Sequence, residues 1–364
     1  MQVRDVYITK AETLTDTFVK SYPLNQFNAL MHLRLRFAAT TGGTSDTVGK
    51  LHHWVSKIEI LDGSNVLQSI SGLELLAFNC FNNGIMPYQD FHGGVSLTTS
   101  EELILCFGRF LGDKGFYFNP KMFSNPTLRI SGAFTVSATA GIATGTGALS
   151  VIARVIESGA PPYQGFIMRK EISNWTSAAS GDQPTVLPLD YPFMGLLVGA
   201  LKTTIPPDTI LTNFKLTRNT DQFIDFNFTG RDAFSNNVEE FGYFKQKFRP
   251  LIGAAAIWLG DLYFQTGAVA SVGGATAKGL ITIVAAESVT WAGTGGETAD
   301  LEEMELEGAA PAASVYFPFH AGNPYLLPDP ADFLNPSGLG DLRLICTQGV
   351  VSAACTVCVE QLHP

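Results

Sequence analysis

Two passages decide how this chain is organised: FGRFLGDKGFYFNPKMFSNP at residues 107–126 and FPFHAGNPYLLPDPADFLNP at residues 317–336. A shift of 210 positions superimposes the first on the second, with six identities in twenty positions and no gap. The identical pairs are Phe107 and Phe317, Gly112 and Gly322, Pro120 and Pro330, Phe123 and Phe333, Asn125 and Asn335, and Pro126 and Pro336. This agreement predicts that the chain contains two copies of one structural unit.

The flanking sequence extends the match. Leu-Arg-Ile at 128–130 follows the first passage, and Leu-Arg-Leu at 342–344 follows the second. Earlier in each half, KIEILDG (57–63) and NFKLTRN (213–219) both have the pattern of a strand and a turn, but they lie only 156 residues apart. The second copy therefore holds 54 extra residues (210 minus 156) between these landmarks. Since solenoid repeats are only about 20–50 residues long, this period indicates a duplicated domain.

Within each half, the sequence pattern predicts short β-strands. LMHLRLRFAA (30–39) and TLRISGAFTV (127–136) alternate apolar and polar residues, and Gly, Pro, Asn and Asp separate such segments. This pattern is typical of sandwiches and barrels. Helices are expected only at 72–84 and 230–242, and single helical turns at Pro120 and Pro330. The expected fold class is all-β, with two tandem eight-stranded jelly rolls, short helices and a long loop insertion in the second.

Changes in composition suggest the boundaries of the parts. Residues 1–22 carry mixed charge and are expected to form an N-terminal arm. Pro161 and Pro162, flanked by glycines, make a compact linker, because proline cannot continue a strand ladder. The first jelly roll would then span 23–160 and the second 161–364. A Gly-, Ala-, Ser- and Thr-rich segment at about 250–313 is expected to be a surface insertion, and its acidic stretch 300–307 a solvated face of an exposed loop or short helix.

The composition points towards self-association and away from nucleic acid. Charged residues make up 15% of the chain, against about 25% in ordinary soluble proteins. This shortage suggests that copies of the chain cover much of its surface. The formal net charge of −10 argues against a phosphate-binding surface. The N-terminus lacks the apolar core of a signal peptide, and the uncharged run 133–153 has a Gly, Thr and Ser centre that favours two strands around a turn over a membrane span.

No arrangement of residues in the sequence predicts catalysis, a cofactor or a metal site. His52 and His53 are adjacent, and on a strand their rings would point to opposite faces and could not share a metal. No zinc-protease, serine-hydrolase, phosphate-loop or dinucleotide motif occurs. Glutamate pairs at 302–303 and 305–307 lie in the insertion without an aromatic platform for a sugar. We therefore expect a protein that is not an enzyme.

The five cysteines are expected to be reduced thiols. Their odd number and the absence of a secretion signal both argue against a disulfide framework. Cys355 and Cys358 have a paired spacing, but they lie in the strand-like segment ACTVCVEQL, where this spacing places the two thiols on opposite faces. Neither metal binding nor redox chemistry is expected there.

The duplicated order of strand, short helix, strand, Phe/Pro turn and paired final strands resembles the double jelly-roll major capsid proteins of tailless icosahedral viruses, the lineage that includes phage PRD1 and adenovirus. The resemblance covers nearly the whole chain. It implies a homotrimer whose six jelly rolls form a pseudo-hexagonal tile of a virion shell, made in the host cytoplasm, with the 250–313 insertion as a tower on its outer surface. The implied partners are the chain itself, neighbouring trimers, penton and minor capsid proteins and an internal lipid membrane. The 1–22 segment lacks the apolar or amphipathic helix that would contact such a membrane directly.

A second hypothesis is a jelly-roll spike or vertex protein that binds a carbohydrate or a receptor. Such a protein should show clustered exposed Trp and Tyr with acidic or amide ligands for calcium. The four tryptophans are instead dispersed along the chain. In the Phe/Pro turns, Phe123 and Phe333 are expected to close the end of each sandwich.

Overall fold

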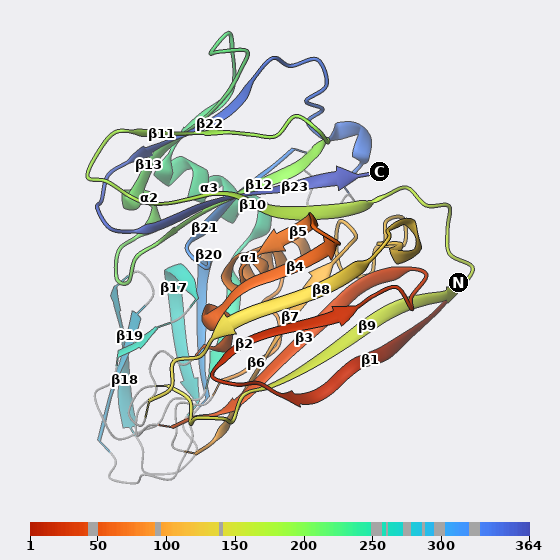
Figure 1. Cartoon of the computed structure of the whole chain (residues 1–364). Coiled ribbons are helices and arrows are strands. Elements are labelled where there is room, and N and C mark those ends of the chain that lie inside the picture. Colours follow the sequence, from red (N-terminus) through yellow and green to blue (C-terminus); the bar gives the residue numbers. More distant parts are fainter. Residues whose placement is uncertain are drawn as a thin grey trace.

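The computed structural model describes residues 1–42, 50–91, 96–137, 141–248, 257–259, 261–271, 278–285, 288–294, 303–319 and 328–364. The described chain is built mostly of strands arranged in facing sheets, with two helices of twelve residues (Figure 1). No helix among these residues is long and apolar enough to cross a membrane. The all-β prediction is therefore confirmed.

The first half forms two sheets that face each other. One sheet has the strand order β1-β9-β3-β7, with the short β6 at its edge, and the other has the order β2-β8-β4-β5. All of these neighbours pair antiparallel. The bounds are β1 Gln2–Thr13, β2 Thr17–Pro23, β3 Leu30–Thr40, β4 Val55–Asp62, β5 Asn65–Ile70, β6 Gln89–Asp90, β7 Thr98–Cys106, β8 Pro126–Ala133 and β9 Ala148–Ser158.

The second half repeats this arrangement strand for strand. Its sheets have the orders β10-β23-β12-β21 and β11-β22-β13-β14, which match the first half when β10–β14 stand for β1–β5 and β21–β23 for β7–β9. Each half is thus a jelly roll of eight strands, and the duplication predicted from the sequence is confirmed. The bounds are β10 Phe166–Thr176, β11 Asp182–Val186, β12 Phe193–Leu201, β13 Leu211–Arg218, β14 Phe223–Thr229, β21 Ser314–Pro318, β22 Leu342–Gln348 and β23 Ala354–His363.

The prediction that residues 1–22 form an N-terminal arm is wrong. Residues 1–22 form β1 and most of β2, and β1 pairs along its length with β9 while β2 pairs with β8. The physical reason is that a jelly roll needs two four-stranded sheets, and β1 and β2 supply one strand to each. The mixed charge of this segment reflects strands at the edges of their sheets, which expose one face to water. We propose that the first unit begins at residue 2 and that its boundary with the second stays near residue 160.

Each unit encloses its own hydrophobic core. In β3, Leu33, Leu35 and Phe37 are fully buried, whereas Arg34 and Arg36 between them point to the other face. This is the period of two that a strand imposes on its side chains. A separate cluster fills the second sandwich, with contributions from β12, β13, β22 and β23. The two cores support the division of the chain into two units.

A helix occupies the same place in each unit, after the fifth strand. Helix α1 (Gly72–Asn83) begins with a capping box between Ser71 and Glu74 and ends at Gly84 in the left-handed conformation, where φ is +70°. Helix α3 (Gly230–Phe241) begins at Thr229, whose hydroxyl accepts a hydrogen bond from the backbone of Asp232. Both helices confirm the sequence-based expectation. A single turn, α2 (Pro207–Ile210), precedes β13.

The insertion expected in the second unit lies between α3 and β21 and contains strands of its own, so neither a plain loop nor, for the acidic stretch, a loop or short helix describes it. Its strands form two small sheets, β15-β20-β17 and β16-β19-β18. Within the acidic stretch, residues 300–302 lie outside the described residues, and 303–307 belong to β20, where Glu305 pairs with Lys245 of β15. The bounds are β15 Phe244–Phe248, β16 Ile257–Leu259, β17 Leu262–Ser271, β18 Lys278–Ala285, β19 Ser288–Thr294 and β20 Glu303–Pro311.

The Phe/Pro turns have the same backbone structure in both units. The 3-10 turns Pro120–Met122 and Pro330–Asp332 are each capped by the side chain of the residue before the proline, Asn119 or Asp329. In both, the amide of the following phenylalanine donates to the carbonyl of the proline. These two turns are equivalent in conformation as well as in sequence.

The other paired residues of the two passages hold less uniform positions. Phe107 is fully buried in the first core and Phe317 almost fully in the second. Gly112 adopts a φ of +90°, while Gly322 lies outside the described residues. The backbone amide of Asn125 donates to Asp62, whereas the side chain of Asn335 accepts from the amide of Ser337. Pro126 begins β8, whereas Pro336 precedes a turn in which its carbonyl accepts from the amide of Leu339.

Phe123 and Phe333 both lie beside β10, on opposite faces of it. The Phe123 ring stacks on Phe118, with centroids 5.0 Å apart, and contacts Phe166. Phe333 is nearly buried in a small cluster with Ile167, outside the main core of the second unit. The two rings therefore fix the start of the strand that joins the units.

We expect Phe333→Ala to lower the free energy of unfolding by about 3–5 kcal/mol, because a nearly buried ring is removed from a packed cluster. Phe123→Ala should cost less, about 2 kcal/mol, because its ring is already partly in water. Urea unfolding followed by tryptophan fluorescence measures both. Val186→Ala is the control, since this apolar side chain is 66% exposed and its loss should change stability by less than about 0.5 kcal/mol. Melting of both variants at the wild-type midpoint would contradict the packing role.

Candidate assembly interfaces

The two jelly rolls of the chain meet where α1 lies on the outer face of the second unit's β10-β23-β12-β21 sheet. Phe81 of α1 stacks on Tyr316 of β21 with ring centroids 5.5 Å apart, and Phe78 meets the same tyrosine edge-on. Leu197 of β12 and Cys358 of β23 complete this apolar cluster. At the sheet edge, β5 and β10 lie side by side in parallel, with Ser69 opposite Lys170. This edge contact makes one continuous sheet of eight strands from both units.

A buried ion pair lies at the centre of this junction. The Arg169 guanidinium of β10 pairs with the Glu360 carboxylate of β23, and both side chains are almost completely buried. Glu360 also accepts from Asn82 Nδ2 of α1 (2.8 Å) and from the Tyr316 hydroxyl (2.7 Å), while Arg169 donates to the carbonyl of Cys106. Burial, together with the adjacent Glu360 carboxylate, raises the pKa of Tyr316 well above its usual value. The network thus links α1 and β7 of the first unit with three strands of the second.

The sequence alone did not indicate these residues. Arg169 and Glu360 each stand as a charge beside an apolar run, in FIMRK and VCVEQ, and that isolation was the available signal. Their pairing depends on the register of β10 against β23, which sets Arg169 opposite Glu360. This register is set by the tertiary structure and cannot be predicted from either segment alone.

The corresponding outer face of the first unit is polar. On the β1-β9-β3-β7 sheet, Asp5 pairs with Arg34 (3.0 Å) and Arg154 (3.4 Å), and Glu102 pairs with Arg36 (3.0 Å). Several of these side chains are partly exposed, in contrast to the apolar residues that α1 covers on the second unit. No helix of the described chain lies on this face in the way that α1 lies on its equivalent.

Among the strands that end the described sheets, β14 and β1 are the equivalents of the two strands that meet inside the chain. Strand β14 ends the β11-β22-β13-β14 sheet, and β1 ends the first unit's sheet. In the strand-by-strand match, β14 corresponds to β5 and β1 to β10, the two strands that meet inside the chain. Phe223 and Ile224 of β14 are exposed by 63% and 54%, and Tyr7 of β1 by 52%. A free edge with apolar side chains is prone to pair with another chain.

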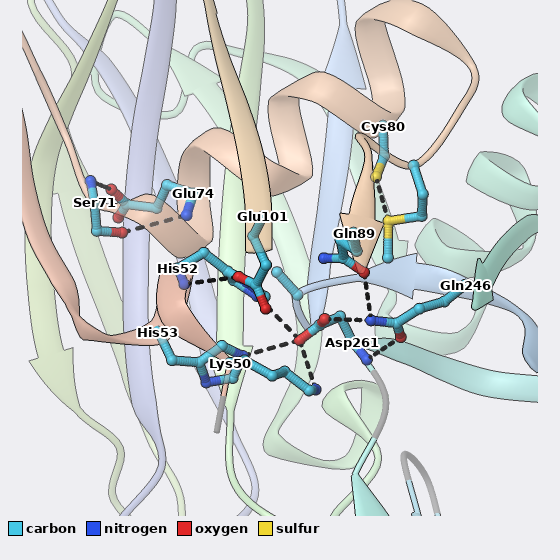
Figure 2. Close-up of polar contacts among 12 residues, drawn as sticks. Lys50, His52, His53, Ser71, Glu74, Cys80, Gln89, Glu101, Gln246 and Asp261 are labelled. Carbon is cyan, nitrogen blue, oxygen red and sulfur yellow. Dashed lines mark hydrogen bonds and ion pairs between the residues drawn. The ribbon is translucent and has the colours of Figure 1, made fainter. Parts of the chain in front are cut away.

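The histidines do not form a catalytic arrangement in the described residues, but two of them meet an acid of the insertion (Figure 2). His52 and His53 lie on the 3-10 turn Leu51–Trp54 rather than on a strand, and both Nε2 atoms approach the same Oδ1 of Asp261, at 3.2 and 2.9 Å. The expectation that these rings point to opposite faces is wrong, because a tight turn rotates successive side chains by about a third of a circle. The Lys50 ammonium also pairs with Oδ1 of Asp261, at 2.8 Å.

Further carboxylate and amide groups surround this cluster. His52 Nδ1 lies 2.6 Å from Glu101, and Gln246 of β15 bonds Asp261 through both its amide nitrogen and its carbonyl oxygen. Burial alone would lower the pKa of His52, but Asp261 and Glu101 raise it to about 9. Burial would raise the pKa of Asp261, yet Lys50 and the His52 imidazolium hold it well below its usual range. The cluster ties the insertion to the first jelly roll.

The remaining histidines and the cysteines lie elsewhere. His32 is buried in β3, His363 lies at the end of β23, and residues 92 and 320 lie outside the described residues. All five cysteines are free and buried. Cys355 faces the second core and Cys358 faces α1, so the predicted opposite orientation is confirmed. Burial raises the pKa of the Cys355 thiol to about 12, which disfavours the reactive thiolate.

Comparison with solved structures places this fold among capsid proteins. The chain is similar to the major capsid protein of Sulfolobus turreted icosahedral virus, with a TM-score of 0.61, 10% sequence identity and coverage of 100% of this chain and 98% of that one. It is similar to VP54 of the virus PBCV-1, with a TM-score of 0.61, 10% identity and coverage of 99% and 93%. It is also similar to the major capsid protein P2 of bacteriophage PM2, with a TM-score of 0.54, 9% identity and coverage of 100% and 98%. The fold is therefore the double jelly roll expected from the sequence.

A scan against protein-family models and a search of curated proteins find no match. The similarity to the solved structures is therefore one of fold: it extends over nearly the whole of each chain, although only about 10% of the residues are identical. The similar structures named above are components of virion capsids.

Removing one partner of the buried pair should strongly destabilise the chain. Glu360→Leu leaves the Arg169 charge buried without a counter-charge, at a cost of about 3–5 kcal/mol in the free energy of unfolding, and Arg169→Met leaves the Glu360 charge unpaired in the same way. The double variant Arg169→Met with Glu360→Leu should lose less than the sum of the single variants, because no unpaired charge remains.

Urea unfolding of the four members of this cycle measures the coupling. Lys215→Met is the control, since its pair with Asp221 is exposed and should contribute no more than about 1 kcal/mol. Additive single-variant effects would show that the pair does not couple the two strands.

His32 should make the chain less stable in mild acid. Burial, with the nearby charges of Arg34 and Arg154, lowers the pKa of His32 from 6.5 to about 4. Between these values the unfolded chain binds a proton that the folded chain does not, so stability is full above pH 6.5 and falls as the pH drops towards 4. The expected loss is about 3 kcal/mol. Unfolding free energies at pH 7 and pH 4.5 should differ less in His32→Asn than in the wild type, and equal pH dependence would contradict this role.

Proposed function

We propose that this protein is a structural subunit of a virion shell, a major capsid protein that acts as a homotrimer, and that it is not an enzyme. The observation that carries the proposal is the strand-for-strand duplication with one internal edge contact, β5 to β10. The similarity in fold to three virion components supports it. Two jelly rolls in one chain suit a shell because each supplies a similar lateral surface for contacts with neighbours.

The internal junction serves as a template for contacts between copies. Inside the chain, strand β5 of the first unit meets strand β10 of the second, and helix α1 of the first unit lies on the outer face of the second. The equivalent elements left free are β14 and α3 of the second unit and β1 with the outer face of the first. If β14 of one copy meets β1 of the next, every junction in the assembly resembles the internal one. Such a head-to-tail contact closes into a ring when the rotation is right, and six similar units require three chains.

The chemistry of the two free surfaces supports this contact. Phe223 and Ile224 are exposed on β14, and next to them a cleft of about 420 Å³ opens between β14, α3 and β21. Aromatic side chains and the polar residues Asn236 and Glu240 line this cleft. Burial raises the pKa of the Glu240 carboxyl. The opposing surface would be the outer face of the first unit, which carries Arg34, Arg36 and Arg154.

In the assembled shell, the partners would be neighbouring trimers, penton and minor capsid proteins and an enclosed lipid membrane, with the 250–313 insertion on the outer surface. No specific binding of nucleic acid is expected, because the net charge is −10. These assignments extend the resemblance to the capsid lineage.

Light scattering with negative-stain microscopy on the purified chain tests the proposal. We expect a particle of about 118 kDa, three times the 39.2 kDa of one chain, with a pseudo-hexagonal outline. The double variant Phe223→Lys with Ile224→Lys should be monomeric while keeping the wild-type circular dichroism spectrum, because the two charges would have to be buried in the contact.

Val186→Lys is the matched control. Val186 is 66% exposed on β11, at the opposite edge of the same sheet, so this variant should remain trimeric. A monomeric wild type that binds sugars on a glycan array would favour the spike or vertex function instead.

A further inference from the structure

The cluster in Figure 2 has the ligand types and the spacing of a transition-metal site. Nε2 of His52, Nε2 of His53 and a carboxylate oxygen of Asp261 all lie within 4.8 Å of one another. Zinc bonds to imidazole nitrogen and carboxylate oxygen are about 2.0–2.2 Å long, which separates neighbouring ligands of a tetrahedral ion by roughly 3.3 Å. The observed separations between Asp261 Oδ1 and the two nitrogens, 3.2 and 2.9 Å, are close to this value.

A second observation concerns the hydrogen bonds of His52. Its side chain is 1% exposed, and its Nε2 atom lies 3.2 Å from Asp261 Oδ1 without the geometry of a hydrogen bond. On the opposite side of the ring, Nδ1 lies 2.6 Å from the Glu101 carboxylate. Metal-bound histidines commonly donate their second ring nitrogen to a carboxylate in this way, which fixes the ring and leaves the other nitrogen available as a ligand.

From these contacts we infer a binding site for a zinc-class divalent ion, ligated by His52, His53 and Asp261, that joins the insertion to the first jelly roll. Two nitrogens and one oxygen are the ligand set of zinc and its neighbours in the first transition row, and not of calcium or magnesium, which take oxygen ligands. The His53 side chain is 28% exposed, so the site opens to solvent on that side and water can supply the fourth ligand.

Lys50 acts as the competitor of the ion. Its ammonium lies 2.8 Å from the same Oδ1 of Asp261 and must leave this oxygen when the ion binds. The exchange balances in charge: two positive charges of the ion replace the Lys50 ammonium and the Nε2 proton of His52, while Asp261 and Glu101 keep their negative charges. The proton and the lysine side chain go to solvent. Removing the lysine should therefore strengthen metal binding.

The site would fasten parts of the chain that lie far apart in sequence. His52 and His53 belong to the turn before β4, and Asp261 precedes β17 of the insertion. Because the unfolded chain does not hold these three ligands together, binding to the folded form raises its stability in proportion to RT ln(1 + [metal]/Kd). The inference does not depend on trimer formation, since all three ligands come from one chain.

Titration calorimetry with Zn²⁺ and the visible absorption of bound Co²⁺ test the site, on untagged full-length protein freed of metal by a chelator. We expect one equivalent of Zn²⁺ per chain and a Co²⁺ spectrum of four-coordinate type. His53→Ala should abolish binding, Glu101→Gln should weaken it roughly 10–100-fold, and Lys50→Met should tighten it.

His363→Ala is the control, because this histidine lies at the end of β23, away from the cluster, and its loss should leave binding unchanged. Asp261→Asn should also abolish Zn²⁺ binding. If this variant does not fold, His53→Ala remains the test, since the His53 side chain is partly exposed and its loss should be tolerated by the fold. Zn²⁺ binding that survives in His53→Ala overturns the inference. If Zn²⁺ binds to Lys50→Met but not to the wild type, the inference is also overturned. The native chain would then use Lys50, and not a metal ion, to neutralise Asp261.

Discussion

The packing of α1 against the outer face of the β10-β23-β12-β21 sheet is the contact on which the architecture of this chain depends. It buries Phe78, Phe81 and Tyr316 together with the Arg169–Glu360 pair. Apolar burial supplies the driving force for packing the two units together. The buried ion pair favours one relative position of the units, because an unpaired charge here would be far more costly than an imperfect apolar contact. The relative position of the two jelly rolls follows from this combination.

Duplication gave the two units the same strand order but different outer faces. On the second unit, Leu197, Cys358 and Tyr316 are apolar or aromatic because α1 covers them. On the first unit, the equivalent sheet carries Arg34, Arg36 and Arg154 with carboxylate partners, because nothing in the described chain covers it in this way. Burial within one chain selects apolar packing, while a face that no helix of the described chain covers retains charge. In the proposed assembly, this charged face of the first unit would lie against the second unit of a neighbouring copy.

The insertion is held more firmly than its composition suggests. Its Gly-, Ala- and Thr-rich sequence is typical of a loose loop, yet Leu306 is fully buried, and Asp261 meets Lys50, His52 and His53 of the other unit. The polar cluster therefore couples an element of the second unit to the first at a second point, separate from the α1 contact. Two points of attachment restrict rotation between the units more than either alone.

Much of the fold could be predicted from the sequence because its signals are local or repeated. Strand alternation, the two helices with their caps and the equivalent turns at Pro120 and Pro330 all follow from residues close together in the chain. The error over residues 1–22 arose because edge strands, exposed on one face, resemble a polar arm. The error over His52 and His53 arose because a 3-10 turn and a strand cannot be separated by periodicity over four residues.

The sequence by itself determined that this chain is two copies of an all-β unit with a large insertion in the second, because the passage repeated 210 residues later and the strand period of two are both visible in the sequence. Only the tertiary structure decided which free edges remain and which charges meet. Arg169 lies opposite Glu360 through the register of two strands nearly two hundred residues apart, and Asp261 reaches His52 across 209 residues. Contacts of this kind leave no local pattern, because they depend on how packed layers face each other rather than on neighbouring residues.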